Sequence, residues 1–296
     1  MQPNNKRSDI NGVVLIDKPL GYSSNQTLSL VKKIFNAKKA GHTGTLDPLA
    51  TGLLPICFGE ATKFSSFSLE SNKSYEASIK LGSSSTTGDL EGEIKSWRIK
   101  NFPTIDAVQK TINKFLGVQE QIPPMFSALK HKGKPLYEYA RKGENIERKK
   151  RAINILKLEL LEYKNNFLKI YVECSKGTYI RSLANDIGED LKTGGHLTGL
   201  KRTSIGSIVI SDSLTIDSIE AMNDVKKKDC LLPTDFLIKD KEKIILDTMR
   251  EKLIKDGKAL PIKDYVSGTY RLYNQKNIFF GLGNVDLYGY LTVKRL

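Results

Sequence analysis

Residues 41–52 read Gly-His-Thr-Gly-Thr-Leu-Asp-Pro-Leu-Ala-Thr-Gly and lead directly into the apolar run Leu53–Phe58. The proline at position 48 disfavours helical backbone angles at Asp47, and the glycines of the stretch allow tight turns or a close approach to a ligand. Two interpretations stay open from these residues alone. The stretch is either an ordinary turn, for which an Asp-Pro pair and glycines are typical, or a loop that presents the Asp47 carboxyl group to a ligand, with His42 five residues before it.

The segments around this loop carry both helix and strand patterns. Gly12–Ile16 is a short apolar run that predicts a buried strand, and Ser23 or Ser24 can cap the helix that follows. The same patterns predict strands at Tyr75–Leu81, Ile155–Tyr163 and Phe167–Cys174, and helices from Thr104 to a C-cap at Gly117 and from Tyr179 to Lys192. Because the predicted helices and strands do not alternate strictly along the chain and are not all strands, we expect an α+β fold with helices packed on a sheet.

The charge of the chain points to a polyanionic partner. Its 296 residues include 47 Lys and Arg against 33 Asp and Glu, which gives a formal net charge of +14. Basic side chains that neutralise phosphates release condensed counterions, so this excess favours nucleic acid. A basic proteome or a need for solubility would give the same excess, and charge alone leaves that alternative open.

Cysteine and histidine are too few and too scattered for a disulfide framework or a metal site. Cysteines stand at positions 57, 174 and 230 without zinc-ligand spacing, and histidines stand at 42, 131 and 196. Residues 1–11 are polar and lack the apolar core of a signal peptide, and no run approaches the roughly 18 apolar residues of a membrane span. We therefore expect a cytoplasmic protein with no bound metal and no membrane association.

Two segments stand apart from the rest. Lys130–Arg151, here called the basic segment, holds nine Lys and Arg against three Glu, a net charge of +6. It is either a solvated loop and helix or a segment that contacts a phosphate backbone, and the overall charge favours the second. From about Lys241 the chain predicts a small module, with a basic helix at Met249–Lys258 and strands at Tyr270–Tyr273, Ile278–Leu282 and Leu291–Val293.

The usual catalytic signatures are missing from the sequence, which has no Walker loop, dinucleotide fingerprint, HExxH or GxSxG. Five other stretches do carry a pattern: NGVVLIDKPLGYSSNQTL (11–28), AGHTGTLDPLATGLLPICFGEATKF (40–64), KSYEASIKLG (73–82), QIPPMFSALKHKGKPLYEYARKG (121–143) and CSKGTYIRSLANDIGEDL (174–191). In this order they resemble the motifs of bacterial tRNA pseudouridine synthases that act on the T-loop uridine, position 55 in tRNA nomenclature. The loop around Asp47 is the longest and most specific of them.

The resemblance implies roles for individual residues. Asp47 matches the essential carboxylate of the family, and Arg181 matches the arginine paired with it. Tyr75 matches the aromatic that lies against the target uracil, and Tyr179 matches a tyrosine that contacts the substrate. Taken singly, Tyr179 and Arg181 could simply begin a helix, so their roles depend on the match of all five stretches.

Three further positions take supporting roles from the same resemblance. His42 matches a residue that helps to hold the flipped-out conformation of the RNA. Leu200, in HLTGLKR (196–202), matches an apolar wall of the pocket, although it could also be ordinary core. Lys18, next to Pro19, matches a motif that mainly supports the site. For the RNA backbone, we expect contacts from the end of the basic segment, at Arg148, Lys149, Lys150 and Arg151.

The resemblance also implies the fold and the partner. It predicts a pseudouridine synthase fold, with a mixed, mainly antiparallel sheet flanked by helices, in residues 1–240, and an RNA-binding insertion at about 124–152. Residues 241–296 would form a small PUA-like RNA-binding domain. We expect a monomer that binds the T-arm of tRNA without guide RNA. One rival is the catalytic subunit of a guide-RNA-dependent particle, which predicts a larger C-terminal domain; another is an RNA-folding factor without enzymatic activity.

The implied chemistry suits these residue types. Converting uridine to pseudouridine breaks an N–C bond, turns the base and makes a C–C bond, so no redox or nucleotide cofactor is needed. A carboxylate can act as nucleophile or as base. An acylal at the ribose, a Michaelis adduct at the base and a glycal route all stay open. An arginine partner favours the ionised carboxylate, and a stacked target base must flip out before it can react.

Overall fold

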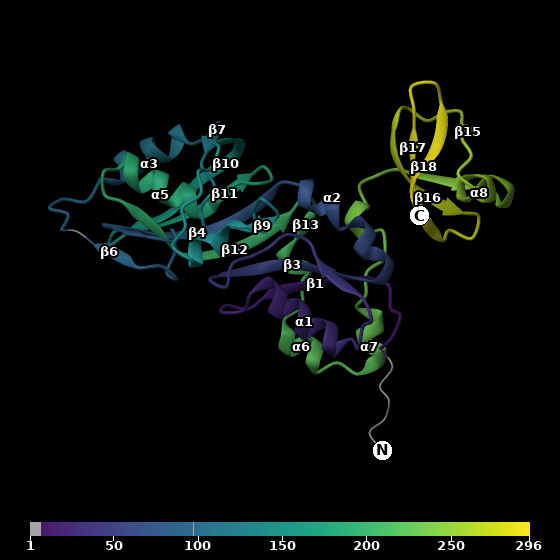
Figure 1. Ribbon diagram of the computed structural model, residues 1–296, viewed down its shortest axis with the longest axis horizontal. Helices are drawn as coiled ribbons and strands as arrows, with labels where there is room; N and C mark the ends of the chain where they lie inside the picture. Colours follow the sequence, from purple (N-terminus) through teal and green to yellow (C-terminus); the bar gives the residue numbers. More distant parts are fainter. Residues whose placement is uncertain (1–6, 97) are drawn as a thin grey trace, which may run out of the picture.

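The computed structural model describes residues 7–96 and 98–296. They form a large domain, which fills the left and centre of Figure 1, and a small C-terminal lobe at the right in yellow and green (Figure 1). Within these described residues, nine strands build the central sheet of the large domain and five build the sheet of the lobe. This architecture confirms the predicted α+β fold with a small β-rich C-terminal domain.

The central sheet is mixed and mainly antiparallel, as predicted. Its path runs through β1 (Gly12–Lys18), β3 (Ala50–Phe58), β12 (Gly195–Ile205), β4 (Lys73–Leu81), β11 (Phe167–Cys174), β10 (Arg151–Lys164) and β7 (Gly117–Gln121). The short strands β2 (Ala40–His42) and β13 (Ile208–Val209) pair with β3 and β12. Along this path only β3 and β12 run parallel to each other. The loop that carries Asp47 therefore enters the sheet beside a strand from far along the chain.

The contact between β3 and β12 depends on Gly52. Its φ is +103°, and a Cβ atom at this position would lie 2.3 Å from the carbonyl oxygen of Arg202. Gly52 also pairs with Lys18 of β1, and Arg202 pairs with Tyr75 of β4. One transverse row of the sheet thus brings together four residues from four separate sequence motifs.

Helices cover the two halves of the sheet with separate apolar cores (Figure 1). Helices α3 (Ile105–Lys114) and α5 (Ile180–Asp190) pack on β4, β10 and β11. Helices α1 (Ser24–Ile34) and α6 (Ile216–Glu220) pack on β1 and β3. The fully buried Leu and Ile side chains in these cores each contribute about 1.5–3 kcal/mol through removal of apolar surface from water.

Local signals in the sequence explain where several elements begin and end. Ser23 caps α1 in a capping box with Gln26, and Thr104 caps α3, as predicted. Asn165 and Asn166 both have positive φ and close the β10–β11 hairpin, which suits asparagine in a tight turn. The sequence prediction was wrong at Gly117, which begins β7 instead of capping α3.

The remaining elements of the large domain are short. They are α2 (Ser65–Glu70), α4 (Leu136–Arg141), α7 (Asp224–Asp229), the strand pairs β5 (Ser83–Ser85) with β6 (Ile94–Ser96) and β8 (Lys130–His131) with β9 (Lys134–Pro135), and three 3₁₀ turns at Gly59–Phe64, Ile210–Asp212 and Phe236–Ile238. The basic segment therefore consists of a small hairpin, α4 and an extended stretch that leads into β10.

The C-terminal lobe contains two more strands than predicted. Its sheet has the order β14 (Lys243–Leu246), β16 (Gly268–Asn274), β17 (Phe279–Val285), β18 (Tyr290–Arg295) and β15 (Leu260–Pro261), and it packs against α8 (Thr248–Lys255). The predicted strands correspond to β16, β17 and β18. The sequence analysis missed β14 and β15, whose four and two residues are too few for a clear alternation. β14 pairs in parallel with β16, and β15 pairs antiparallel with β18.

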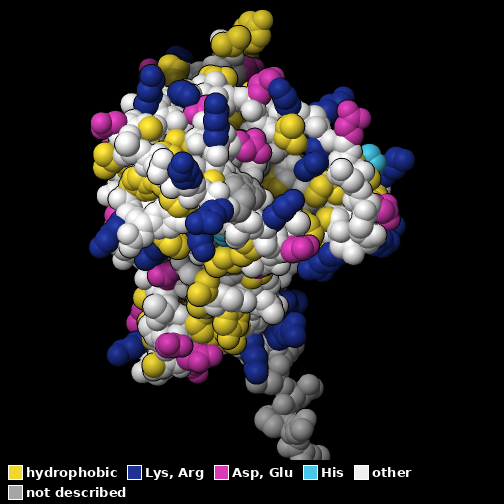
Figure 2. Space-filling view, turned by 90° about the vertical axis from the view of Figure 1, so that its left-hand side faces the viewer, with side chains coloured by type: hydrophobic (Ala, Val, Ile, Leu, Met, Phe, Trp, Pro, Cys, Tyr) yellow, Lys and Arg dark blue, Asp and Glu magenta, His cyan; other side chains and the backbone are white. Residues whose placement is uncertain are grey.

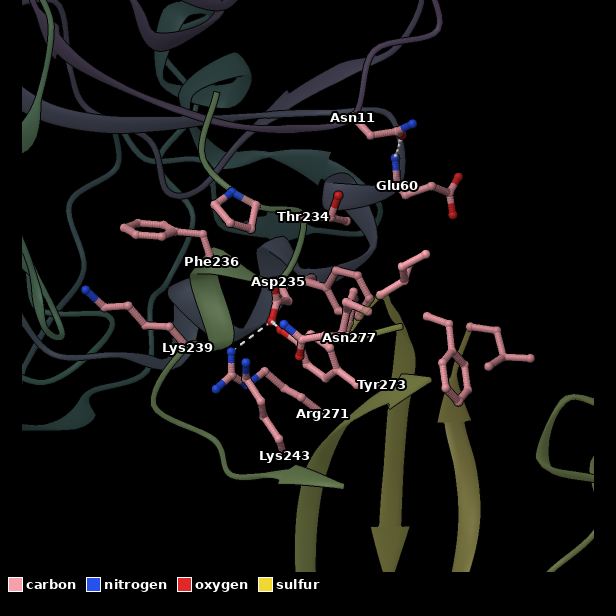
Figure 3. A pocket seen from close by; sticks show the side chains of 16 residues that line it. Asn11, Glu60, Thr234, Asp235, Phe236, Lys239, Lys243, Arg271, Tyr273 and Asn277 are labelled. Atoms are coloured by element: carbon pink, nitrogen blue, oxygen red, sulfur yellow. Dashed lines mark hydrogen bonds and ion pairs between the residues drawn. The ribbon is translucent and has the colours of Figure 1, made fainter. Parts of the chain in front are cut away.

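The lobe docks on the large domain beside a cavity of about 710 Å³ (Figure 3). Asp235, which is buried, accepts hydrogen bonds from Arg271 at 2.8 Å and from the Tyr273 hydroxyl. Apolar contact continues from Phe64 of the large domain to Leu282 of the lobe. These contacts join the two sheets through both a polar and an apolar connection.

We predict that Gly52→Ala destabilises the protein far more than Gly117→Ala does. Both glycines belong to the central sheet and have positive φ, but a Cβ atom at Gly117 would meet nothing within 4 Å. Gly117→Ala should therefore cost only the left-handed backbone conformation, about 1–2 kcal/mol. Gly52→Ala should add about 1–3 kcal/mol of steric overlap with Arg202. Denaturant unfolding measures both, and equal losses would contradict the role given to Gly52.

Candidate active site

The Asp47 loop, residues 43–49, is fixed on both sides by hydrogen bonds. The Ser24 hydroxyl at the start of α1 accepts from the Leu46 N–H at 2.7 Å and donates to the Leu46 carbonyl at 3.0 Å. The Gly21 N–H donates to the Pro48 carbonyl at 2.9 Å, and the Ala50 N–H donates to the Asp47 carbonyl at 3.0 Å. The loop is thus an ordered turn that holds the Asp47 side chain in one place.

Arg181, in the first turn of α5, connects two carboxylates. Its Nε lies 3.0 Å from Oδ2 of Asp47 and 3.6 Å from Oδ2 of Asp89. The other two nitrogens of the guanidinium donate to the carbonyls of Thr87, at 3.1 Å, and Phe126, at 2.7 Å. Because Arg181 is only 6% exposed and all three nitrogens have acceptors, its orientation is fixed.

Asp89 is held as firmly as its partner. It is buried, its Oδ1 accepts from the Thr87 hydroxyl at 2.5 Å and from the Glu91 N–H at 3.0 Å, and it follows the β5 strand. The result is a row of Asp47, Arg181 and Asp89 in which one arginine balances two acids.

Opposing effects act on the ionisation of Asp47. Burial raises the pKa of this carboxyl group above its ordinary value, the charge of Arg181 lowers it, and Asp89 raises it again. The side chain nevertheless keeps 38% of its surface accessible, so it can meet a substrate. Arg181 is therefore the group that favours the ionised carboxylate in a setting that otherwise disfavours charge.

Asp47 opens into a pocket of about 540 Å³, here called the Asp47 pocket. Four other residues singled out from the sequence line it: Tyr75 on β4, Tyr179 and Arg181 at the start of α5, and Leu200 on β12. Tyr179 is the N-cap of α5, where its N–H and carbonyl are both bonded by the side-chain amide of Gln121. The structure thus brings these five predicted residues to one place.

Two other predicted residues lie near the pocket but do not line it. The Lys18 side chain is fully buried and donates to the carbonyls of Pro19 and Tyr22. Burial lowers the pKa of Lys18 to about 8, and Asp47 opposes that effect. His42 lies on β2 with a buried Nδ1 that has no hydrogen-bond partner among the described residues. Burial, and then the charge of Arg202, lowers the pKa of His42, which favours a neutral ring.

The four basic residues predicted to contact the RNA backbone differ in their surroundings. Arg148 is bonded to its own chain, donating to the carbonyls of Ile146 at 3.2 Å and Pro123 at 3.1 Å. Lys150 lies 3.4 Å from a Glu120 carboxylate oxygen. Lys149 and Arg151 are exposed. Figure 2 views the molecule from the left-hand side of Figure 1 and shows Lys and Arg side chains spread over that whole face, with acidic side chains between them.

Sequence reasoning missed Asp89, Arg202 and Lys73. Asp89 gave little signal, because an acid after Thr-Thr-Gly suggests an ordinary turn. Arg202 was within reach: it stands two residues after Leu200 on a strand, and period-two alternation places both side chains on one face. Lys73 begins β4 two residues before Tyr75 and follows the same rule. Arg202 and Lys73 can be placed at the site only once β12 and β4 are set in register, and Asp89 only once the turn after β5 is placed.

The described ranges, 7–96 and 98–296, contain no group of three or more His, Cys, Asp or Glu side chains that could hold a metal ion. The same ranges contain no helix that is long and apolar enough to cross a membrane.

Comparison with known sequences identifies the family. The N-terminal model of the TruB family of pseudouridylate synthases matches residues 32–180, and two C-terminal models, described for tRNA pseudouridylate synthase B and for pseudouridine synthase II TruB, match 181–239 and 243–296. The chain belongs to the TruB family. It is 45% identical to tRNA pseudouridine synthase B of Nitrosospira multiformis, over 100% of this chain and 98% of that protein. The Haemophilus influenzae protein of the same name is 43% identical, over 96% of this chain and 92% of its own length.

Solved structures agree with the fold. A chain of a Cbf5-Nop10-Gar1 complex superposes with a TM-score of 0.69 at 24% identity, over 94% of this chain and 79% of that one. A chain of an archaeal box H/ACA sRNP Nop10-Cbf5 complex gives a TM-score of 0.71 at 20% identity, over 99% and 89%. At these identities the likeness concerns the fold alone.

We predict that Arg181→Gln raises the pKa of Asp47 further, because it removes the charge that lowers this pKa. Arg181→Lys should raise it less, since the positive charge stays. Titration of ¹³C-labelled aspartate carboxyl groups by NMR measures the change.

A matched variant is Lys114→Gln. Lys114 lies 2.7 Å from Asp190 and lowers the pKa of that carboxyl group. The same spectra should then show the pKa of Asp190 rising while the Asp47 signal titrates as in the unmodified protein. An Asp47 titration that is the same with and without Arg181 would contradict the electrostatic pairing.

Proposed function

We propose that this chain is a tRNA pseudouridine synthase that isomerises the T-loop uridine at position 55, without guide RNA and with Asp47 as its essential carboxylate. The observation that carries the proposal is the ion pair of Asp47 with the buried Arg181 inside a pocket lined by Tyr75 and Leu200. Membership of the TruB family and full-length similarity to proteins named tRNA pseudouridine synthase B support the reaction and the substrate class.

The reaction is an intramolecular transfer, so the residues must provide charge, orientation and proton transfer. The carboxylate of Asp47 either attacks carbon, at C1′ or C6, or removes a proton from the sugar. The fixed guanidinium of Arg181 keeps the carboxylate ionised and oriented in each case. The isomerisation has no net gain or loss of electrons, which agrees with the expectation that it needs no redox cofactor.

Access of the base to Asp47 requires base flipping, because a uridine stacked between its neighbours cannot enter the pocket. Tyr75 offers an aromatic surface beside Asp47, and Leu200 offers an apolar wall on the adjacent strand. Tyr179, at the N-terminus of α5, is placed to contact the nucleotide. His42 and Lys18 support the loop and strand around the pocket and do not line it.

Two regions outside the pocket are proposed to bind the T-arm. The first is the basic segment, whose Lys149 and Arg151 are exposed at the N-terminal end of β10. The second is the lobe of residues 241–296, which we propose acts as a PUA-like RNA-binding module. We infer a cytoplasmic monomer from the charge, the cysteine usage and the absence of any sequence feature that calls for a partner chain.

An RNA-folding factor without catalysis is the competing function. Opening the T-loop is a prerequisite for the chemistry, so the two activities can coexist in one protein. An intact Asp47–Arg181 pair with an accessible carboxylate favours the enzyme, because a protein that only binds RNA would not need a buried arginine to orient an acid.

We predict that Asp47→Asn abolishes pseudouridine formation and leaves tRNA binding nearly intact. The amide keeps the size of the side chain but cannot act as nucleophile or base. Turnover on tRNA lacking the modification should fall to background, while the dissociation constant should change by less than about tenfold, or about 1.4 kcal/mol. Asp106→Asn, at an exposed position in α3, is the control and should keep full activity. If Asp47→Asn kept more than about a few per cent of turnover, Asp47 would not be the essential carboxylate.

We predict that replacing Lys149, Lys150 and Arg151 together by Gln weakens binding to all tRNAs alike and flattens the salt dependence. Each phosphate contact that is lost should reduce the log–log slope of affinity against salt by about 0.7–0.9. Filter binding at several salt concentrations measures the slope.

The matched control replaces Lys226, Lys227 and Lys228 of α7 by Gln, which removes the same charge from another surface. Its slope should stay close to that of the unmodified protein. If the two triple variants gave equal slopes of affinity against salt, the basic segment would be a solvated surface that does not contact phosphates.

A further inference from the structure

The wall of the Asp47 pocket contains two buried cations that have no part in the chemistry described so far. Arg202 is 1% exposed and Lys73 is 8% exposed, and both line the pocket with Asp47. Within the described residues, neither forms an ion pair with a carboxylate. Burying an unpaired charge is unfavourable, so such groups are rare unless they have a function.

Two backbone carbonyls accept hydrogen bonds from Arg202. Its Nε donates to Leu53 of β3 at 2.8 Å, and one terminal nitrogen donates to Gly44 of the Asp47 loop at 3.3 Å. The other terminal nitrogen lies 3.5 Å from the position that a Cβ atom on Gly44 would occupy. The guanidinium therefore sits at the junction of the sheet and the Asp47 loop, in cross-strand register with Tyr75.

Lys73 is held in the same way. Its ammonium group donates to the carbonyls of Ser68, Leu69 and Ser71, at 3.0, 2.7 and 2.6 Å, where α2 ends. These bonds satisfy the donors without cancelling the charge. Burial lowers the pKa of Lys73 to about 8, and the nearby charge of Arg202 lowers it as well.

The groups that face Arg202 leave its charge uncompensated. The groups whose pKa values respond to the guanidinium are Tyr75, His42, Lys73 and Lys18, and none of them is a carboxylate. Burial lowers the pKa of Arg202 itself, but an arginine side chain remains protonated in proteins. Arg181 differs, because Asp47 and Asp89 balance its charge. The positive charge of the pocket wall that no carboxylate balances thus belongs to Arg202, together with Lys73.

We propose that Arg202 supplies the positive charge that stabilises the uracil ring while the ring carries negative charge during isomerisation, with Lys73 adding to the same field. The inference rests on the proposed function, and it concerns the detached or activated base, whereas Arg181 serves the carboxylate. A fixed charge in a site from which water is excluded acts on such an intermediate without reorganisation.

Negative charge passes through the base in each route that the chemistry allows. When the N1–C1′ bond breaks, its electron pair stays on N1 and is shared with O2 and O4. If the Asp47 carboxylate instead adds to C6, the charge falls on C5 and O4. C5 then bonds to C1′ with an electron pair from the ring, and the bond from the Asp47 carboxylate to C1′ or C6 breaks and releases the carboxylate; in the glycal route the sugar instead regains the proton that Asp47 removed. The proton on C5 leaves and N1 takes up a proton, so atoms and electrons balance in each route.

The test compares uridine with 5-fluorouridine at the target position of a T-arm RNA. Fluorine withdraws electrons and stabilises the uracil anion, so the fluorinated base depends less on help from the protein. Arg202→Gln and Arg202→Met remove the charge, and Arg202→Lys keeps it. Single-turnover consumption of each base should fall at least about tenfold for uridine in both neutral variants, with a smaller fall for 5-fluorouridine. Arg202→Lys should keep the ratio of the two rates seen in the unmodified protein.

Thermal unfolding and RNA affinity establish that each variant is folded, because loss of the bonds to Leu53 and Gly44 could also disturb the strand contact. Equal losses for uridine and 5-fluorouridine in a folded neutral variant would mean that Arg202 is structural and would overturn the proposal. Failure of both neutral variants to fold would count against it in the same way. An unmodified protein that leaves target uridine unchanged would instead refute the proposed function, so the two failures are distinguishable.

Discussion

The close approach of β3 and β12 at Gly52 is the constraint on which the site depends. A side chain at this position would overlap the backbone of Arg202, so only glycine lets the two strands pair in parallel. This pairing places the Asp47 loop, which leads into β3, beside Leu200 and Arg202 on β12. Pairing of β12 with β4 then adds Tyr75. Residues from distant parts of the chain meet because one register joins three strands.

Arg181 adds a second connection, between the site and the surface that is proposed to bind RNA. Its guanidinium reaches the Asp47 loop, the turn that holds Asp89, and the carbonyl of Phe126, just before the basic segment. A shift of that segment on RNA binding would therefore act directly on an acceptor of the arginine that orients Asp47. Placement of the base and preparation of the carboxylate can be coupled through a single side chain in this way.

The sequence predicted much of this architecture where the signal was local. Caps at Ser23 and Thr104 and the asparagine pair at 165–166 are set by backbone chemistry within a few residues. Asp47, Tyr75 and Arg181 were found through their motifs, and the structure brings them into one pocket. Asp89 was missed because its position depends on packing between distant segments, which no short pattern encodes. Arg202 was missed because no strand was predicted around Leu200. The short strands β7 and β14 were missed because they exist only through their partners.

The two arginines of the pocket have different electrostatic effects, because their partners differ. Arg181 faces two acids, and their negative charges balance its positive charge. Its four contacts therefore fix the orientation of Asp47 and add little positive potential to the pocket. Arg202 faces only carbonyls and uncharged or basic groups, so its field extends into the pocket. Burial alone would push Asp47 towards its neutral form. Arg181, and after it Lys18, oppose that tendency before the reaction. In the proposed mechanism Arg202 acts later, when negative charge moves onto the base.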